Sequence, residues 1–136
     1  MSRIFLDTNI LVHTHDNSDP VKRARAKSVI SGLEGTPMVP VISTQVLQEF
    51  YNVLTRKLGL SPAAGKDAIE QLAEIETISI TRAIIYAATD IHSNASISFW
   101  DALIVSAAQA AGCQEIWTED MSTGQKFGQL IIVNPL

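Results

Sequence analysis

Four acidic residues in this chain of 136 residues follow strands or lie in the first turns of helices, where an α/β sheet could bring them together around a metal. They are Asp7, Glu49, Asp101 and Asp120. Asp7 directly follows the apolar run at 4–6, and Asp120 comes two residues after the run at 115–118. Because two carboxylates about 4 Å apart repel by about 4 kcal/mol at an effective dielectric constant of 20, such a group requires a positive charge. All-oxygen ligands favour Mg²⁺ or Mn²⁺, so the pattern predicts metal-assisted attack on a phosphoryl group.

Glu49 and Asp101 are expected on helices. Glu49 lies in the second turn of a helix that begins after Ser43-Thr44, and the spacing of its apolar neighbours places its carboxylate beside the buried stripe. Asp101 lies in the first turn of a helix that Ser98 caps. Each acid also has an ordinary structural explanation: a salt bridge or a solvated side chain for Glu49, a capping box for Asp101, and a turn or helix cap for Asp7 and Asp120. The metal site therefore depends on all four acids converging.

The elements that would carry these acids alternate between strands and helices. Short apolar runs predict strands at 4–6, 39–42, 77–80, 115–118 and 130–133, and helices are predicted at 10–12, 20–31, 45–58, 62–75, 81–91 and 99–111. Such alternation predicts the α/β class, with an open parallel sheet flanked by helices and residues 1–136 forming a single domain. In open α/β sheets, ligands bind beyond the carboxyl ends of the strands, where the strand order reverses.

The composition excludes several classes of protein. With 46% hydrophobic and 18% charged residues, the chain is neither disordered nor collagen-like. The net charge of −4 argues against a polyanionic partner, yet with four acids around a metal the other 10 acidic residues balance the 10 basic ones. The lone Cys113 excludes an internal disulfide and a cysteine-based zinc site. No leader pattern and no apolar stretch of about 18 residues is visible, so we expect a cytoplasmic protein without a membrane span.

Four segments resemble the motifs of the PIN-domain nucleases, and among these the VapC-type toxins of toxin–antitoxin modules. The segments are IFLDTN at 4–9, STQVLQEF at 43–50, SFWDALI at 98–104 and WTED at 117–120. The resemblance implies a PIN-like α/β/α fold and a metal-dependent endoribonuclease that uses Mg²⁺ or Mn²⁺. It implies that Asp7 and Asp101 are the main ligands, that Glu49 and Asp120 complete the site or orient the water, and that Asn9 and Thr118 hold these carboxylates by hydrogen bonds. It also implies an RNA substrate, a cognate antitoxin on a separate chain, and a homodimer.

Two further acidic and basic features have more than one explanation. Glu119 adjoins Asp120, and the family pattern of Thr, any residue, Asp selects Asp120; Glu119 is then expected to face away, although it could substitute if the loop twists. His13 and His15 look like a metal pair, but residues two apart on a helix face different ways, which favours a surface or substrate contact. No histidine is required for the chemistry.

Clustered basic residues are the other open feature. Four of the ten cations fall within 22–27, and Arg56-Lys57 follow at the end of the Glu49 helix. They could contact RNA phosphates or form an ordinary solvated helix face.

Phosphohydrolases that form an aspartyl-phosphate need a second Asp where this chain has Asn9, which disfavours that class. The remaining alternative is a non-catalytic RNA- or protein-binding module of the same fold.

Overall fold

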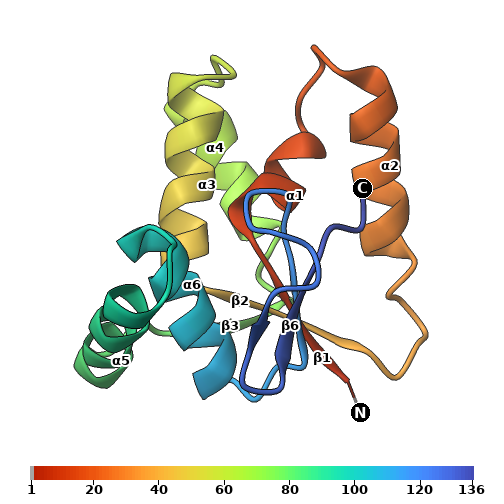
Figure 1. Cartoon of the computed structure of the whole chain (residues 1–136). Helices are drawn as coiled ribbons and strands as arrows, with labels where there is room; N and C mark the ends of the chain where they lie inside the picture. Colours follow the sequence, from red (N-terminus) through yellow and green to blue (C-terminus); the bar gives the residue numbers. More distant parts are fainter. Residues whose placement is uncertain (1) are drawn as a thin grey trace.

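A six-stranded sheet forms the centre of the computed structural model, which describes residues 2–136 (Figure 1). The strands are β1 (Arg3–Leu6), β2 (Val39–Ser43), β3 (Glu76–Ile78), β4 (Glu115–Trp117), β5 (Lys126–Phe127) and β6 (Leu130–Val133). Their order is β3-β2-β1-β4-β6-β5, and every neighbouring pair is parallel except β5 and β6. The predicted α/β class with an open, mainly parallel sheet is confirmed.

The antiparallel hairpin of β5 and β6 is the one departure from a parallel sheet. Its turn contains Gly128, whose φ of 64° suits a residue without a Cβ atom. β5 has only two residues, too few to produce an apolar pattern, so the sequence did not predict it.

The helices are α1 (Thr8–His13), α2 (Pro20–Ser31), α3 (Thr44–Arg56), α4 (Pro62–Glu70), α5 (Arg82–Asn94) and α6 (Phe99–Ala110). The predicted caps at Asp19 and Ser98 are confirmed, since each side chain accepts a hydrogen bond from a backbone N–H of the first turn. The prediction of a helix up to Ile75 was wrong, because α4 ends at Glu70 and turns follow it. Leu72 and Ile75 still pack against the core from those turns, so apolar spacing alone did not distinguish them from helix.

The connections place the helices in two layers. Right-handed crossovers from β1 to β2 and from β2 to β3 put α1–α4 on one face of the sheet, while the return from β3 to β4 puts α5 and α6 on the other. Figure 1 shows α5 and α6 together at the lower left and α2 to the right of the sheet. The strand order therefore reverses between β1 and β4, where a ligand site is expected.

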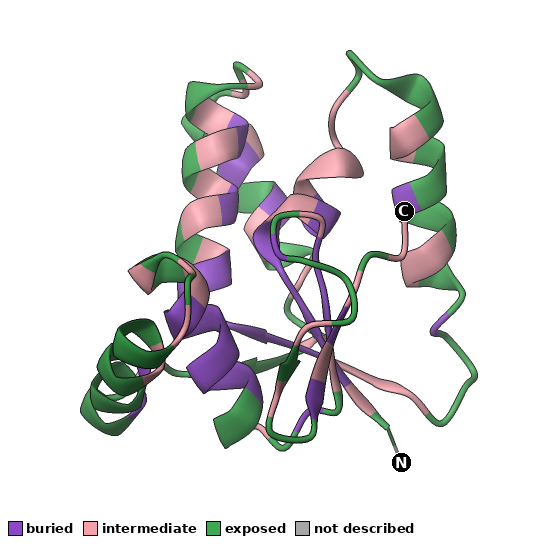
Figure 2. Cartoon of the chain, in the orientation of Figure 1, coloured by how far each residue is buried: buried purple, intermediate pink, exposed green. Residues whose placement is uncertain are grey.

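The core lies where β1 and α6 meet. Ile4, Phe5 and Leu6 are fully buried because β1 has a strand on each side and helices on both faces. Figure 2 shows α6 as a largely buried helix, and its residues 102–108 are all buried. Cys113 is buried as well, and burial raises the pKa of its thiol to about 11. No helix within residues 2–136 has the length and hydrophobicity needed to cross a membrane.

Candidate active site

Asp7 stands at the carboxyl end of the central strand. Its backbone N–H donates to the Trp117 carbonyl at 3.0 Å, which extends the pairing of β1 with β4 by one residue. The side chain is 4% exposed. One carboxylate oxygen accepts from the Thr8 backbone N–H at 2.7 Å, and the other from the Thr118 hydroxyl at 2.8 Å. Asp7 is thus the N-cap of α1 and is also held rigidly at the switch point.

Asn9 and Thr118 connect Asp7 to Asp120. The Asn9 amide donates to the Thr118 hydroxyl at 3.0 Å and to an Asp120 carboxylate oxygen at 2.9 Å. Its own carbonyl oxygen accepts from the Glu119 backbone N–H at 3.3 Å, which fixes the orientation of the amide. The Thr118 hydroxyl also accepts from the Asp120 backbone N–H at 3.1 Å. These bonds join the ends of β1 and β4 into one polar network.

Glu49 reaches this region from α3, which begins after the Ser43 cap. The Thr8 hydroxyl donates to one Glu49 oxygen at 2.7 Å, and the Gln45 amide lies 3.5 Å from the other. Sequence reasoning missed Thr8 and Gln45 as partners of Glu49. Gln45 could have been found, because it precedes Glu49 by four residues and therefore shares its helix face.

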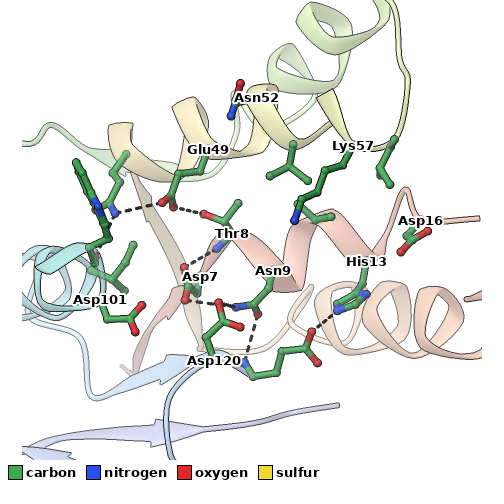
Figure 3. Close-up of a pocket in the computed structure, with 17 residues that line it drawn as sticks. Asp7, Thr8, Asn9, His13, Asp16, Glu49, Asn52, Lys57, Asp101 and Asp120 are labelled. Carbon is green, nitrogen blue, oxygen red and sulfur yellow. Dashed lines mark hydrogen bonds and ion pairs between the residues drawn. The ribbon is translucent and has the colours of Figure 1, made fainter. Parts of the chain in front are cut away.

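Asp101 approaches from the opposite helical layer. It lies in the first turn of α6, where its backbone N–H donates to the Ser98 hydroxyl at 3.1 Å. The four predicted acids then line one cavity of about 550 Å³ (Figure 3). The fold therefore brings together carboxylates from β1, α3, α6 and the loop after β4.

The electrostatics of this cavity are unbalanced. In the described part of the chain, none of the four acids has an ion-pair partner. Burial, reinforced by the charges of Glu49 and Asp120, raises the pKa of Asp7 to about 7 despite the hydrogen bonds from Thr118 and Thr8. Burial and then the charge of Asp120 also raise the pKa of Asp101. The cavity thus gathers four carboxyl groups that form no ion pair with any side chain of residues 2–136.

The donor set fits a hard divalent cation. Among residues 2–136, no three His, Cys, Asp or Glu side chains stand close enough to form a ready-made metal cluster. The acids that share the cavity are nevertheless all oxygen donors, the ligand type that Mg²⁺ and Mn²⁺ prefer. A bound cation would also remove the cost of ionising Asp7 and Asp101, because it inverts the local electrostatics.

Glu119 differs from its neighbour Asp120. It pairs with His13 and, at 2.8 Å, with the Lys22 ammonium of α2. Burial opposes its ionisation, but the hydrogen bonds from Lys22 and His13 outweigh burial and hold the pKa of Glu119 below its usual value. Glu119 is therefore a neutralised acid at the edge of the cavity, engaged with α1 and α2.

The two clustered histidines face different ways, as predicted. His13 contacts Glu119, whereas His15 packs edge-on against Phe50 with 5.6 Å between ring centroids. Two further residues also line the cavity: Trp100, which sequence reasoning did not assign to the site, and Lys57, for which it left open a contact with RNA phosphates. Trp100 could have been suspected from its place beside Asp101.

Comparisons with known proteins agree with this fold. The PIN domain family model matches residues 4–122. Among curated proteins, no sequence matches this one. A solved toxin–antitoxin complex from Klebsiella pneumoniae superposes with a TM-score of 0.73 at 21% identity, over 98% of each chain.

Two further solved structures have the same fold. The Mycobacterium tuberculosis toxin VapC20, which cleaves the sarcin–ricin loop, has a TM-score of 0.70 at 22% identity, over 86% of this chain and 89% of its own. VapBC2 from Rickettsia felis, bound to a DNA fragment from its promoter, has a TM-score of 0.70 at 19% identity, over 97% of this chain and 98% of that chain.

Proposed function

The chain belongs to the PIN domain family, and on that premise we propose that it is a metal-dependent endoribonuclease, the toxin of a toxin–antitoxin pair. The observation that carries the proposal is the cavity at the switch point between β1 and β4, lined by four carboxylates that form no ion pair within the described residues 2–136. Their side chains are Asp7, Glu49, Asp101 and Asp120. Unbalanced acids that converge in one cavity are a feature of functional sites rather than of stabilising ion pairs.

Asp7 and Asp101 are the main metal ligands in this proposal. Asp7 is fixed through both oxygens by Thr8 and Thr118, so it offers a preorganised anchor at little entropic cost. Asp101 approaches from α6 and completes the pair from the other helical layer. A bound Mg²⁺ or Mn²⁺ ion supplies positive charge that stabilises the phosphoryl oxygens as negative charge builds up on them.

Glu49 and Asp120 complete the site or orient the attacking water. Glu49 is aimed by the Thr8 hydroxyl, and Asp120 by the Asn9 amide, so each keeps one defined orientation toward the cavity. The water oxygen forms a bond to phosphorus, and the bond between phosphorus and the leaving 3′ oxygen breaks. A carboxylate or solvent takes up the water proton, and the leaving 3′ oxygen takes a proton from solvent. The products are a 5′ phosphate and a 3′ hydroxyl.

The test is cleavage of total cellular RNA by the purified protein with Mg²⁺, Mn²⁺ or EDTA. We expect cuts that need metal and that the Asp7→Asn variant does not make, while Asp90→Asn, an exposed acid of α5 outside the cavity, cuts like the unmodified protein. Mapping the 5′ ends identifies the target. Equal cutting by the protein and by Asp7→Asn would refute the proposal, and no cutting at all would favour a non-catalytic RNA- or protein-binding module.

We also propose that the protein acts on RNA in the cytoplasm, that it forms a homodimer, and that a cognate antitoxin protein binds it. Two of the solved structures with this fold are toxin–antitoxin assemblies, which supports the antitoxin partner. Induced expression should stop bacterial growth, and the Asp7→Asn variant should not. Sedimentation of the purified protein then determines whether two copies associate.

A further inference from the structure

Two side chains of the carboxylate cavity have no role in the mechanism above. Trp100 belongs to the first turn of α6, and Lys57 caps the end of α3. Both line the same cavity as the four acids. An RNA substrate would bring flat bases and negative phosphates into this cavity. An aromatic face and a free ammonium on the cavity walls are therefore candidates to contact it.

Trp100 is held in place without being covered. It is 62% exposed, whereas the other tryptophan, Trp117, is 9% exposed and donates its indole N–H to Glu115. The Trp100 carbonyl accepts from the Gln45 amide at 3.2 Å, and its ring packs edge-on against Phe99 with 5.3 Å between centroids. The indole is thus fixed beside Asp101 with much of its surface free, which suits a stacking platform.

Lys57 is an uncommitted cation. No ion pair involves it in the part of the chain that the structure describes, although four carboxylates share its cavity. Figure 3 shows its side chain extending from α3 into the cavity, on the opposite side of Asp7 and Glu49 from Asp101. Lys22 does not line the cavity and pairs with Glu119, whereas Lys57 lines the cavity and is available for a phosphate.

We propose that Trp100 and Lys57 are substrate contacts on either side of the scissile phosphate. Trp100 stacks on an unpaired nucleobase next to that phosphate, and Lys57 binds a neighbouring phosphate on the far side. The inference rests on the proposed ribonuclease function and specifies its substrate: the RNA must be single-stranded at the cut, because a base within a duplex is covered by its neighbours. The two contacts also set the direction in which the RNA crosses the carboxylates.

Cleavage kinetics on an oligonucleotide that contains a mapped cut site test the stacking contact. Trp100→Ala should raise KM about 5- to 150-fold, the range for loss of one stacked base, with a smaller change in kcat. Trp100→Phe should restore most of the affinity because a phenyl ring still stacks. The matched control is Tyr86→Ala, since Tyr86 is 61% exposed on α5 but lies outside the cavity.

The salt dependence of KM tests the phosphate contact. Lys57→Gln should raise KM and reduce the slope of log KM against log salt by about 0.7, the value for one phosphate contact to a single strand. Lys66→Gln removes an exposed lysine of α4 outside the cavity and should leave the slope unchanged. An unchanged slope in Lys57→Gln would refute the role of Lys57.

A binding measurement separates this inference from the proposed function. In the Asp7→Asn variant with Mg²⁺, which should not cut, a single-stranded oligonucleotide should quench the fluorescence of Trp100, and a duplex of the same sequence should not. The double variant that also carries Trp100→Ala should show no quenching. If the unmodified protein cleaves RNA but Trp100→Ala has the same KM as Tyr86→Ala, the inference is refuted and the proposed ribonuclease function is not. If no variant cleaves RNA, the proposed ribonuclease function is refuted, and the quenching measurement still decides whether Trp100 stacks on RNA.

Discussion

The two ends of strand β1 differ in whether their charged residue has a partner of opposite charge. At its start, the Arg3 side chain pairs with Glu76 and donates to the Ala111 carbonyl at 2.7 Å, and the Arg3 backbone N–H donates to the Gln114 side-chain oxygen at 2.6 Å. At its end, four residues later, Asp7 has only neutral hydrogen-bond partners and lies near other acids. Both residues adjoin the same parallel ladder, so the strand itself does not explain the difference.

The pKa values of Glu76 and Asp7 show how ionisation at each end of the strand affects folding. The hydrogen bond from Arg3 lowers the pKa of Glu76, so the ionised form of Glu76 favours the folded state. Burial raises the pKa of Asp7 to about 7, so ionisation there opposes folding. A charged pair at the amino end of a strand supports structure, whereas an unbalanced carboxylate at the carboxyl end is held for a ligand. The contrast can be tested from both ends.

The largest difference is expected in cleavage activity. Asp101→Asn removes one charge from the cavity and should lower kcat at least about a hundredfold, because a metal ligand and its charge are lost. Glu76→Gln, at the other end of the sheet, should stay within about twofold of the unmodified protein. Steady-state cleavage of one RNA oligonucleotide measures both, and similar activity in the two variants would contradict the contrast.

The metal-free protein should lose stability as the pH rises. The folded-state pKa of Asp7, about 7, lies above its ordinary value of 3.8, so the folded state binds more protons between these values and the free energy of unfolding falls with pH. The stabilising contribution is complete below about pH 4 and lost through pH 7, a change on the order of 4 kcal/mol. Urea unfolding in EDTA at several pH values measures it. Asp7→Asn should flatten the curve; parallel curves would exclude Asp7 as the cause.

Metal should reverse that loss. At pH 8, Mn²⁺ at a hundred times its Kd should stabilise the protein by about 2.7 kcal/mol, seen as a rise in Tm. Glu76→Gln should respond equally, because it is far from the cavity, and Asp7→Asn should respond much less. Equal rises in all three proteins would mean that the metal binds elsewhere.

Loss of the hydroxyl that joins the two strand ends should have an intermediate effect. Thr118→Val leaves Asp7, Asn9 and the Asp120 backbone N–H each short of one partner, which should cost about 1–3 kcal/mol of stability. Activity should fall about tenfold or more because Asp7 and Asp120 lose their orientation. Thr118→Ser keeps the hydroxyl and serves as the control in urea unfolding and in cleavage assays.

The smallest effect is expected at the start of β1. Because the Arg3–Glu76 pair is partly exposed, Glu76→Gln should change stability by less than about 1 kcal/mol, and high salt should shrink the difference further. Urea unfolding at low and high salt measures this. A loss of several kcal/mol would show that the pair is structural in a way its exposure does not suggest.

The sequence predicted the strands and helices that carry the site because their apolar runs and caps are local signals. Asp7 after β1 and Asp120 after β4 followed from strand ends alone, and the cap at Ser98 placed Asp101 in the first turn of its helix. The alternation of elements gave the α/β class and, with it, the edge of the sheet to inspect. The strand β5 was missed because two residues are too few to show an apolar period. The end of α4 was missed because the apolar spacing continues past it through Leu72 and Ile75.

What the sequence by itself determined is therefore the set of acids and the elements that bear them. Tertiary structure decided which groups hold the acids and which acids are neutralised. Thr8 and Gln45 form hydrogen bonds with Glu49. Lys22 and His13 form ion pairs with Glu119 but with none of the four acids of the proposed metal site. The pattern of Thr, any residue, Asp selects Asp120 over its neighbour Glu119, but only the packing of α1 and α2 against the loop after β4 shows that Glu119 is neutralised. The reason is physical: secondary structure depends on neighbours along the chain, whereas the charge balance of a carboxylate depends on groups that folding brings from distant segments.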